Sequence, residues 1–153
     1  MAAITAAAGV LGAAIPQIPV LIRDIRQAGQ DRRERQAAGI RQACLDLLSA
    51  AGSLQAEVAN AGLCHGAEMD EKLVEIRSCA AAVKLHAASI ELLAPATLGP
   101  CAERLAREAV RLAELAVEKT DPIAKQMVEV PLPGPLDEAA EAFRERAVAE
   151  AGK

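Results

Sequence analysis

Aromatic residues are almost missing from this 153-residue chain, which has one Phe (Phe143) and neither Tyr nor Trp. Proteins that bind single-stranded nucleic acid stack its bases on aromatic rings, and β-strands favour alternating runs of β-branched and aromatic residues. The shortage therefore argues against a nucleic-acid surface and against a β-sheet protein. Hydrophobic residues make up 52% of the chain and are mainly Ala, Leu, Val and Ile. Because Ala and Leu are strong helix formers, the composition predicts an all-α protein.

Charged side chains are also missing from the first 22 residues, MAAITAAAGVLGAAIPQIPVLI. Residues 23–41 then hold six Arg against three acidic residues, whereas the whole chain has a net charge of −4. Within the uncharged segment, small residues recur at four-residue steps, a pattern that suits close contact between helices in lipid. The residues of this helix-contact ridge are Thr5, Ala8, Gly9, Gly12 and Ala13.

Three roles fit residues 1–22, and the sequence leaves all three open. The segment is a buried helix of a soluble bundle, a membrane-spanning helix, or a helix that packs in one state and inserts into a membrane in another. About 20 apolar residues span a bilayer core, although Pro16, Gln17 and Pro19 interrupt this run. The following basic segment is either a solvated hinge or a collar for anionic head groups. The collar residues are Arg23, Arg26, Arg32, Arg33 and Arg35.

Three further segments carry apolar residues at alternating spacings of three and four, which places them on one face of a helix. Gly62 and Gly66 separate the first two segments, and Pro95 with Gly99-Pro100 separates the last two. Short connections of this kind favour antiparallel neighbours. The three stripes are Ala37, Ile40, Cys44, Leu47, Ala51, Leu54, Val58 and Ala61; Met69, Leu73, Ile76, Ala80, Val83, Ala87 and Ile90; and Leu98, Ala102, Leu105, Ala109, Leu112 and Ala116.

We therefore expect an all-α fold, an up-and-down four-helix bundle with an apolar N-terminal helix and an additional short C-terminal helix. The final helix has few large apolar side chains, so we expect it to dock weakly. The predicted parts are an apolar helix at 1–22, a basic hinge at 23–36, an antiparallel bundle at 37–120, a Pro-rich connector at 121–135 and the C-terminal helix at 136–153.

The sequence favours no metal or cofactor site. Cys64-His65, Cys79 and His86 are the residues that would suggest a zinc site. However, Cys79 and His86 lie seven residues apart, about 10 Å along a helix, which is too far for both to bind one ion. Ligand pairs on a helix need spacings of three or four residues, so we expect no metal and no cofactor.

Enzyme activity is not expected either. The chain has no Gly-rich phosphate loop, no GxSxG and no HExxH motif, which are patterns of common catalytic sites. Cys101 follows Pro100 at a predicted helix start, a position that lowers a thiol pKa, but no motif places a His beside it. Cys44 lies on a core stripe and is expected to be inert.

The order of segments resembles the HeLo and HeLo-like domains, which are N-terminal helical bundles of cell-death and immunity proteins. The resemblance rests on the apolar residues 2–22 with Gly9, Gly12 and Ala13, on the charged stretch, and on the helical segment to about Gly62. It implies that the first helix inserts into membranes when the protein assembles. It also implies a defence or cell-death role, as in a bacterial effector.

We therefore expect a non-enzymatic, membrane-active or membrane-associated helical interaction module. Its expected partners are further copies of itself, an anionic membrane or another protein, with no nucleic acid. A cytoplasmic location with membrane association is expected, because no Lys or Arg precedes the apolar run as in a secretory signal. The alternative is a soluble helical-bundle adaptor that self-associates or binds a partner protein without a membrane.

Overall fold

The computed structural model describes residues 17–152, with side chains from residue 27 onward. The described part contains four helices, α1 (Gln17–Ala61), α2 (Ala67–Leu93), α3 (Gly99–Glu118) and α4 (Gly134–Ala151). A hairpin of two-residue strands, β1 (Thr120–Asp121) and β2 (Gln126–Met127), lies between α3 and α4. Its strands are antiparallel, with Thr120 opposite Met127 and Asp121 opposite Gln126. The predicted all-α class is confirmed.

The chain divides between Ala38 and Gly39 into two units. The first unit includes helical residues 17–38 of α1, and its described side chains, at 27–38, are all exposed. Residues 23–36, predicted as a hinge, are therefore helical. The physical reason is their content of Arg, Gln, Ala and Glu, which have high helix propensity. Residues 17–22 of the predicted apolar helix also belong to α1, whereas residues 1–16 lie outside the described part.

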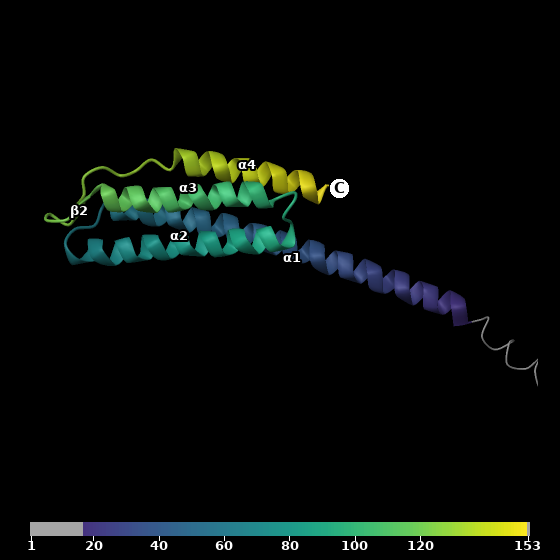
Figure 1. Ribbon diagram of the computed structural model, residues 1–153. Helices are drawn as coiled ribbons and strands as arrows, with labels where there is room; N and C mark the ends of the chain where they lie inside the picture. The colour runs from purple at the N-terminus through teal and green to yellow at the C-terminus, as the bar shows by residue number, and fades with distance from the viewer. Residues whose placement is uncertain (1–16, 153) are drawn as a thin grey trace, which may run out of the picture. The chain divides into compact units, whose positions relative to one another are not determined.

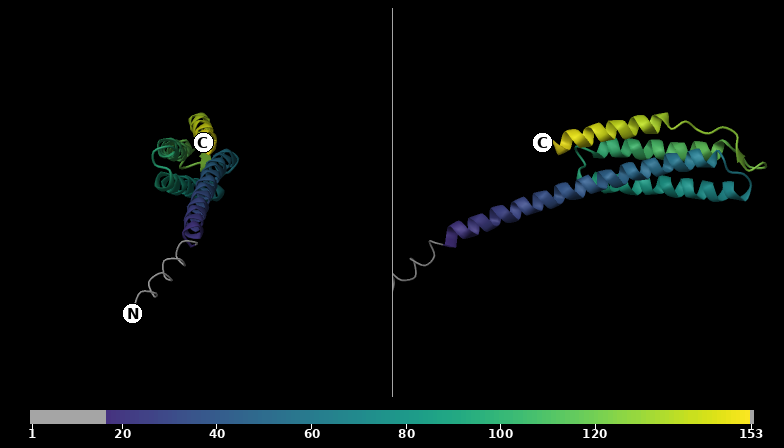
Figure 2. Two further views of the ribbon diagram at one scale, coloured as in Figure 1. Left: turned by 90° about the vertical axis from the view of Figure 1, so that its right-hand side faces the viewer. Right: turned by 180° about the vertical axis from the view of Figure 1, so that it is seen from behind.

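The second unit is an up-and-down bundle in which residues 39–61 of α1 pack with α2, α3 and α4 (Figure 1). Figure 2 shows these helices from one end and from behind, arranged around a single core. Ala alternates with Leu, Ile or Val along the buried faces, so the helices approach closely. The largest fully buried side chains are Phe143, Leu47, Leu54, Met69, Ile76, Ile90, Leu98, Leu105, Leu136 and Val83.

The predicted apolar stripes form this core. The α1 stripe is buried from Cys44 to Ala61, whereas Ala37 is exposed and Ile40 is half-buried. The α2 stripe is buried except for the half-buried Leu73, and the third stripe, from Leu98 to Ala116, is buried throughout. Burying one large aliphatic side chain contributes about 1.5–3 kcal/mol, so these stripes hold the bundle together.

Prolines set the turn between α2 and α3, as predicted. The helix α2 ends at Leu93, and the Ala94 N–H still donates to the Ile90 carbonyl at 2.8 Å. The N–H groups of Leu98 and Gly99 then donate to the Ala94 carbonyl at 3.0 and 3.1 Å. Pro100 occupies the first turn of α3, where its missing N–H costs no hydrogen bond.

A contact between two connections closes one end of the bundle. The Gly66 N–H donates to the Lys125 carbonyl at 2.9 Å, and His65 forms a β-bridge with Gln126. Gly66 has a φ of 62°, a left-handed conformation that Gly adopts without steric cost. The predicted connector at 121–135 thus contains part of a hairpin that was not predicted.

Asp121 caps the hairpin turn. Its Oδ1 accepts hydrogen bonds from the backbone N–H groups of Ile123 at 2.7 Å and Ala124 at 2.9 Å. These two hydrogen bonds lower the pKa of the Asp121 carboxyl, because they favour its charged form. The bond from Ala124 has the larger effect.

The C-terminal helix α4 completes the bundle, rather than adding a fifth helix to it. Phe143 is fully buried and Leu136 is 1% exposed. The prediction that this helix docks weakly is therefore wrong. The reason is that Phe143, the single aromatic residue of the chain, supplies one large apolar contact. The other apolar residues of α4 are mainly Ala. The Gln55 side-chain amide also donates to Asp137 Oδ1 at 2.5 Å, which joins α1 to α4.

Candidate interaction surface

The predicted membrane-contact residues all belong to the first unit, residues 1–38. The ridge residues Thr5, Ala8, Gly9, Gly12 and Ala13 lie outside the described part of the chain. Of the collar, Arg23 and Arg26 are helical, and Arg32, Arg33 and Arg35 are exposed on α1. The Arg35 Nε donates to the Asp31 carbonyl at 3.1 Å. None of the described helices has a stretch long and apolar enough to cross a bilayer.

The four cysteines are all free thiols. Cys44 is buried on α1, and Cys79 and Cys101 are half-buried on α2 and α3. Cys64 lies in the connection between α1 and α2, with its thiol 3.5 Å from the Asn60 carbonyl. Within residues 27–152, no three His, Cys, Asp or Glu side chains lie close enough to hold a metal ion. The half-buried Cys79 and His86 both belong to α2.

Two of the thiols are poor nucleophiles at neutral pH. Burial raises the pKa of the Cys44 thiol. Burial also raises the pKa of the Cys79 thiol, and the carboxylates of Glu57 and Glu75 raise it further. Because the thiolate is the reactive form, these shifts lower the reactivity of both residues.

Lys72 joins α1 to α2 next to Cys79. Its Nζ pairs with Glu57 Oε2 of α1 at 2.7 Å and also with Glu75 on α2. The hydrogen bond to Glu57, followed by the one to Glu75, raises the pKa of Lys72, and the bond from Lys72 lowers the pKa of Glu75. Lys72 thus bridges two carboxylates and links α1 to α2, which is typical of a structural ion pair.

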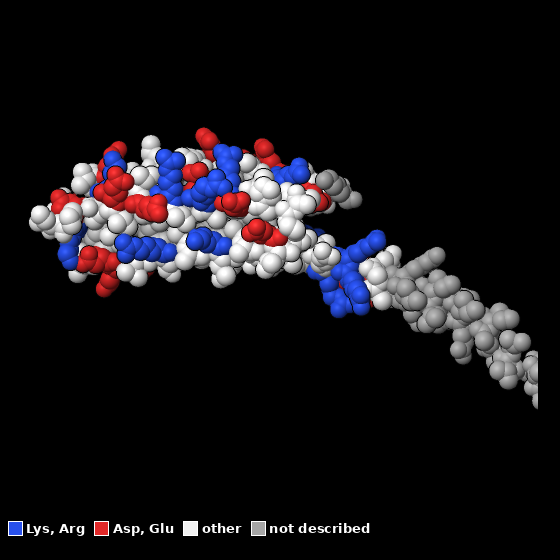
Figure 3. All heavy atoms as spheres, viewed as in Figure 1, with Lys and Arg blue, Asp and Glu red and all other residues white. Residues whose placement is uncertain are grey.

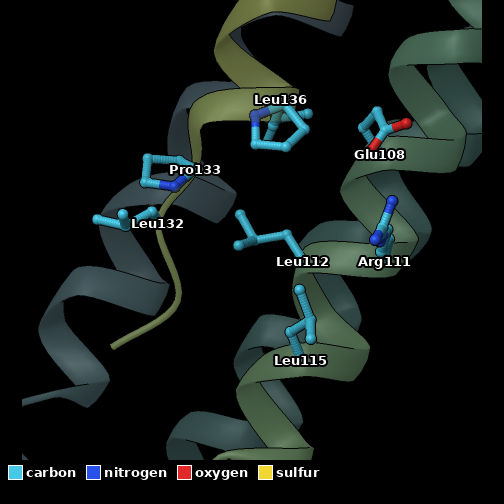
Figure 4. Close-up of a pocket in the computed structure, with 8 residues that line it drawn as sticks. Glu108, Arg111, Leu112, Leu115, Leu132, Pro133 and Leu136 are labelled. Atoms are coloured by element: carbon cyan, nitrogen blue, oxygen red, sulfur yellow. The ribbon is translucent and has the colours of Figure 1, made fainter. Parts of the chain in front are cut away.

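One hollow of the bundle is small. It has a volume of about 80 Å³ and lies between α3 and the segment that enters α4 (Figure 4). This volume holds about two or three water molecules, whereas small-molecule sites have about 300–1,000 Å³. Its lining residues include Glu108, Arg111, Leu112, Leu132 and Leu136.

Two wider hollows, of about 410 and 570 Å³, are open grooves between α2 and α3. They share Lys84, Val110 and Glu114. Ala side chains line most of the rest of the first groove, whereas the charged Glu103, Arg107 and Arg111 line most of the rest of the second. Figure 3 shows Lys and Arg side chains interspersed with Asp and Glu over this face of the bundle. Open grooves do not enclose most of a small ligand, so they are poor catalytic pockets.

The outer face of α2 carries a regular series of exposed residues. Six exposed residues follow one another at spacings of four and three, and we call them the outer stripe. Val74 is 64% exposed, Leu85 is 68% exposed and Leu92 is 86% exposed, and the other members are small. The outer stripe consists of Val74, Ser78, Ala81, Leu85, Ala88 and Leu92.

The outer stripe lies opposite the buried face of the same helix. Leu85 is nine residues from the fully buried Ile76, which is half a turn around the axis at about 100° per residue. The helix α2 is therefore apolar on two opposite faces. One face packs into the core, and the other carries three large aliphatic side chains in solvent.

Charged residues flank the outer stripe. Arg77, Lys84 and Glu91 follow its edge toward α3, and Glu75 lies on the other edge toward α1. Glu75 pairs with Lys72, whereas Arg77 and Glu91 make no ion pair within the described residues. A polar rim around an apolar stripe is the usual composition of a protein interface.

This surface was not predicted, although its signal is present in the sequence. The stripe from Met69 to Ile90, with five large apolar residues, is the stronger of two series along this segment. A second series at the same spacings, from Val74 to Leu92, runs along the opposite face. Two apolar series in one helix predict a second contact surface.

Comparisons with models of protein families, with curated proteins and with solved structures gave no match. The resemblance to HeLo and HeLo-like domains therefore stays a prediction from the order of the segments.

Proposed function

We propose that this protein is a non-enzymatic helical interaction module that binds an apolar helix of another polypeptide on the outer stripe of α2. The observation that carries the proposal is the exposure of Val74, Leu85 and Leu92 in heptad spacing on one helix face. Heptad spacing keeps a continuous seam facing a partner helix along several turns. Scattered single hydrophobic residues, by contrast, are common on any surface.

The energetics favour occupation of this face. Fully burying a Leu or Val side chain contributes about 1.5–3 kcal/mol, and Val74, Leu85 and Leu92 each have most of their surface still to bury. Ala81 and Ala88 between them allow a second helix to approach closely.

Site-specific photo-cross-linking in the source cells tests this function. A photoreactive amino acid replaces Ala81 on the outer stripe in one sample and Ala149, an exposed residue of α4, in the matched control. We expect a discrete cross-linked species from position 81 and none from position 149, and Leu85→Glu should remove it. Equal cross-linking at both positions, or none at position 81, contradicts the proposal.

Membrane association through the first unit is a second candidate function. It is supported by the uncharged sequence of residues 1–22 and by the exposed Arg32, Arg33 and Arg35 that follow it on α1. In this function the ridge at Thr5, Ala8, Gly9, Gly12 and Ala13 supplies contacts between inserted helices, and the arginines bind anionic head groups.

Co-sedimentation of the full chain with vesicles tests the second candidate. The vesicles contain phosphatidylcholine with or without phosphatidylglycerol. A basic residue near an anionic membrane contributes about 1 kcal/mol, so Arg33→Glu should weaken binding at least about fivefold. The same change at Arg104, exposed on α3, is the control. Equal effects of the two variants, or no binding to either vesicle, would refute membrane association through this collar.

A further inference from the structure

We infer that the polypeptide bound on the outer stripe is a second copy of this chain, with the two α2 helices antiparallel and related by a two-fold axis near Val83. This inference rests on the proposed function and names the partner. It follows from the order of large and small residues along the stripe and from the charges on its edges.

The antiparallel register brings large residues opposite small ones at the centre. With the axis near Val83, Ala81 lies opposite Leu85 of the second copy, and Ser78 lies opposite Ala88 of the second copy. At each end, Val74 lies opposite Leu92 of the second copy. One register therefore aligns all six stripe residues at once, so the surface is complementary to itself.

The edge charges favour the antiparallel arrangement over the parallel one. A two-fold axis across the helices brings the same edge of each copy together, so Arg77 meets Glu91 of the second copy, twice in the dimer. A parallel pair brings opposite edges together. It would place Asp70 next to Glu75 of the second copy and Arg77 next to Ala82, which gives no attractive pair.

One like-charge approach occurs in the antiparallel pair, between Lys84 and its equivalent near the axis. Lys84 is exposed and lines the same grooves as Glu114 of α3, so water and this carboxylate reduce the repulsion. Since Arg77 and Glu91 have no ion pair within the described chain, both are available to the second copy.

The size of the surface sets the expected strength of the dimer. Val74 and Leu92 are 18 residues apart, about 27 Å along the helix. Two helices of about 10 Å diameter in contact over this length bury on the order of 1,000 Å² in total, at the lower limit of specific interfaces. We therefore expect a reversible, concentration-dependent dimer rather than an obligate one.

Sedimentation velocity of the full chain from about 1 to 500 µM tests the inference. We expect the wild-type chain to pass from monomer to dimer, and Leu85→Glu to raise the dissociation constant at least tenfold, since it puts a charge opposite Ala81 at the centre. The matched control is Val148→Glu on α4, because Val148 is 69% exposed and Leu85 is 68% exposed. The control should dimerise like the wild type.

A charge swap tests the orientation. Arg77→Glu and Glu91→Arg each replace two attractive pairs by repulsive ones, so each should raise the dissociation constant about tenfold. The double variant restores opposite charges and should dimerise like the wild type. Single variants without effect, or a double variant that is not rescued, would overturn the antiparallel register.

A chain that stays monomeric up to about 500 µM overturns the inference. The occupant of the stripe would then be residues 1–16 or another protein, and not a second copy. The proposed function fails separately. If the wild-type chain is monomeric but Leu85→Glu still removes the cellular cross-link at position 81, the docking function stands and the second copy is the wrong partner. If Leu85→Glu and Val148→Glu behave alike in both experiments, both proposals fail.

Discussion

Matched truncations on the two faces of α2 should have very different effects on stability. Ile76 is fully buried and Leu85 is 68% exposed, and both belong to the same helix. Changing either residue to Ala removes three carbon atoms. The comparison therefore holds the helix and the size of the change nearly constant and varies the environment of the side chain.

The expected magnitudes follow from the burial. Ile76→Ala leaves a cavity in the core and should cost about 3 kcal/mol of unfolding free energy. About a third of the Leu85 surface is covered, so truncation loses roughly a third of the burial free energy of about 2 kcal/mol. The higher helix propensity of Ala offsets about 0.2 kcal/mol of this loss. The net cost of Leu85→Ala is then about 0.5 kcal/mol.

Chemical denaturation followed by far-UV circular dichroism measures both costs. The protein should be at about 1 µM, below the range in which the weak interface expected here forms dimers. At about 4 °C per kcal/mol, thermal midpoints should fall by roughly 12 °C for Ile76→Ala and roughly 2 °C for Leu85→Ala. A loss for Leu85→Ala similar to that for Ile76→Ala would refute the reasoning, because the stripe would then be covered within the monomer.

Three further predictions concern the rest of the bundle. Phe143→Ala should cost about 3–5 kcal/mol and should release α4, which hydrogen exchange of residues 134–151 detects as faster exchange. A Cβ on Gly62 would collide with Val130, so Gly62→Ala should cost about 1–3 kcal/mol, and adding Val130→Ala should recover stability in a double-mutant cycle. Folding lowers the pKa of Asp121. The contribution of this carboxylate to stability is therefore present above its unfolded pKa of about 3.9 and is lost as the pH falls through its folded pKa. Between pH 5 and 2.5 the wild type should therefore lose more stability than Asp121→Ala; equal losses would contradict the role of this carboxylate.

The core could be predicted because its signal is local and repeated. Apolar residues at spacings of three and four, such as Leu47, Leu54 and Val58 in α1, identify one helix face without knowledge of the neighbours. Helix ends at Gly and Pro were equally readable, since Pro95 and Pro100 act through their own backbone geometry. Burial in the structure agrees with these predictions over α2 and α3.

Features that depend on tertiary contacts could not be predicted. The hairpin between α3 and α4 is held by a bond from the Gly66 N–H to the Lys125 carbonyl, which lies 59 residues further along the chain. The docking of α4 depends on the fit of Phe143 into a core made by other helices. Neither contact has a pattern within its own segment.

The outer stripe is a third kind of feature, neither purely local nor made by tertiary contacts. Its residues were visible in the sequence, but their meaning depends on which face of α2 the bundle leaves in solvent. Val74, Leu85 and Leu92 are as apolar as core residues, and only the burial of the opposite face, with Ile76 and Val83, shows that they are exposed. A helix with two apolar faces needs the fold to tell the core face from the interface.

Hydroxyl-radical footprinting of the full chain at increasing concentration tests most directly whether the outer stripe is an open surface that closes on binding. At about 1 µM, Leu85 and Leu92 should be oxidised at rates comparable to Val148 and far faster than the buried Ile76. As the concentration rises toward 500 µM, Leu85 and Leu92 should become protected while Val148 does not. Protection of Leu85 and Leu92 equal to that of Ile76 at the lowest concentration, or no protection at the highest, would contradict the account.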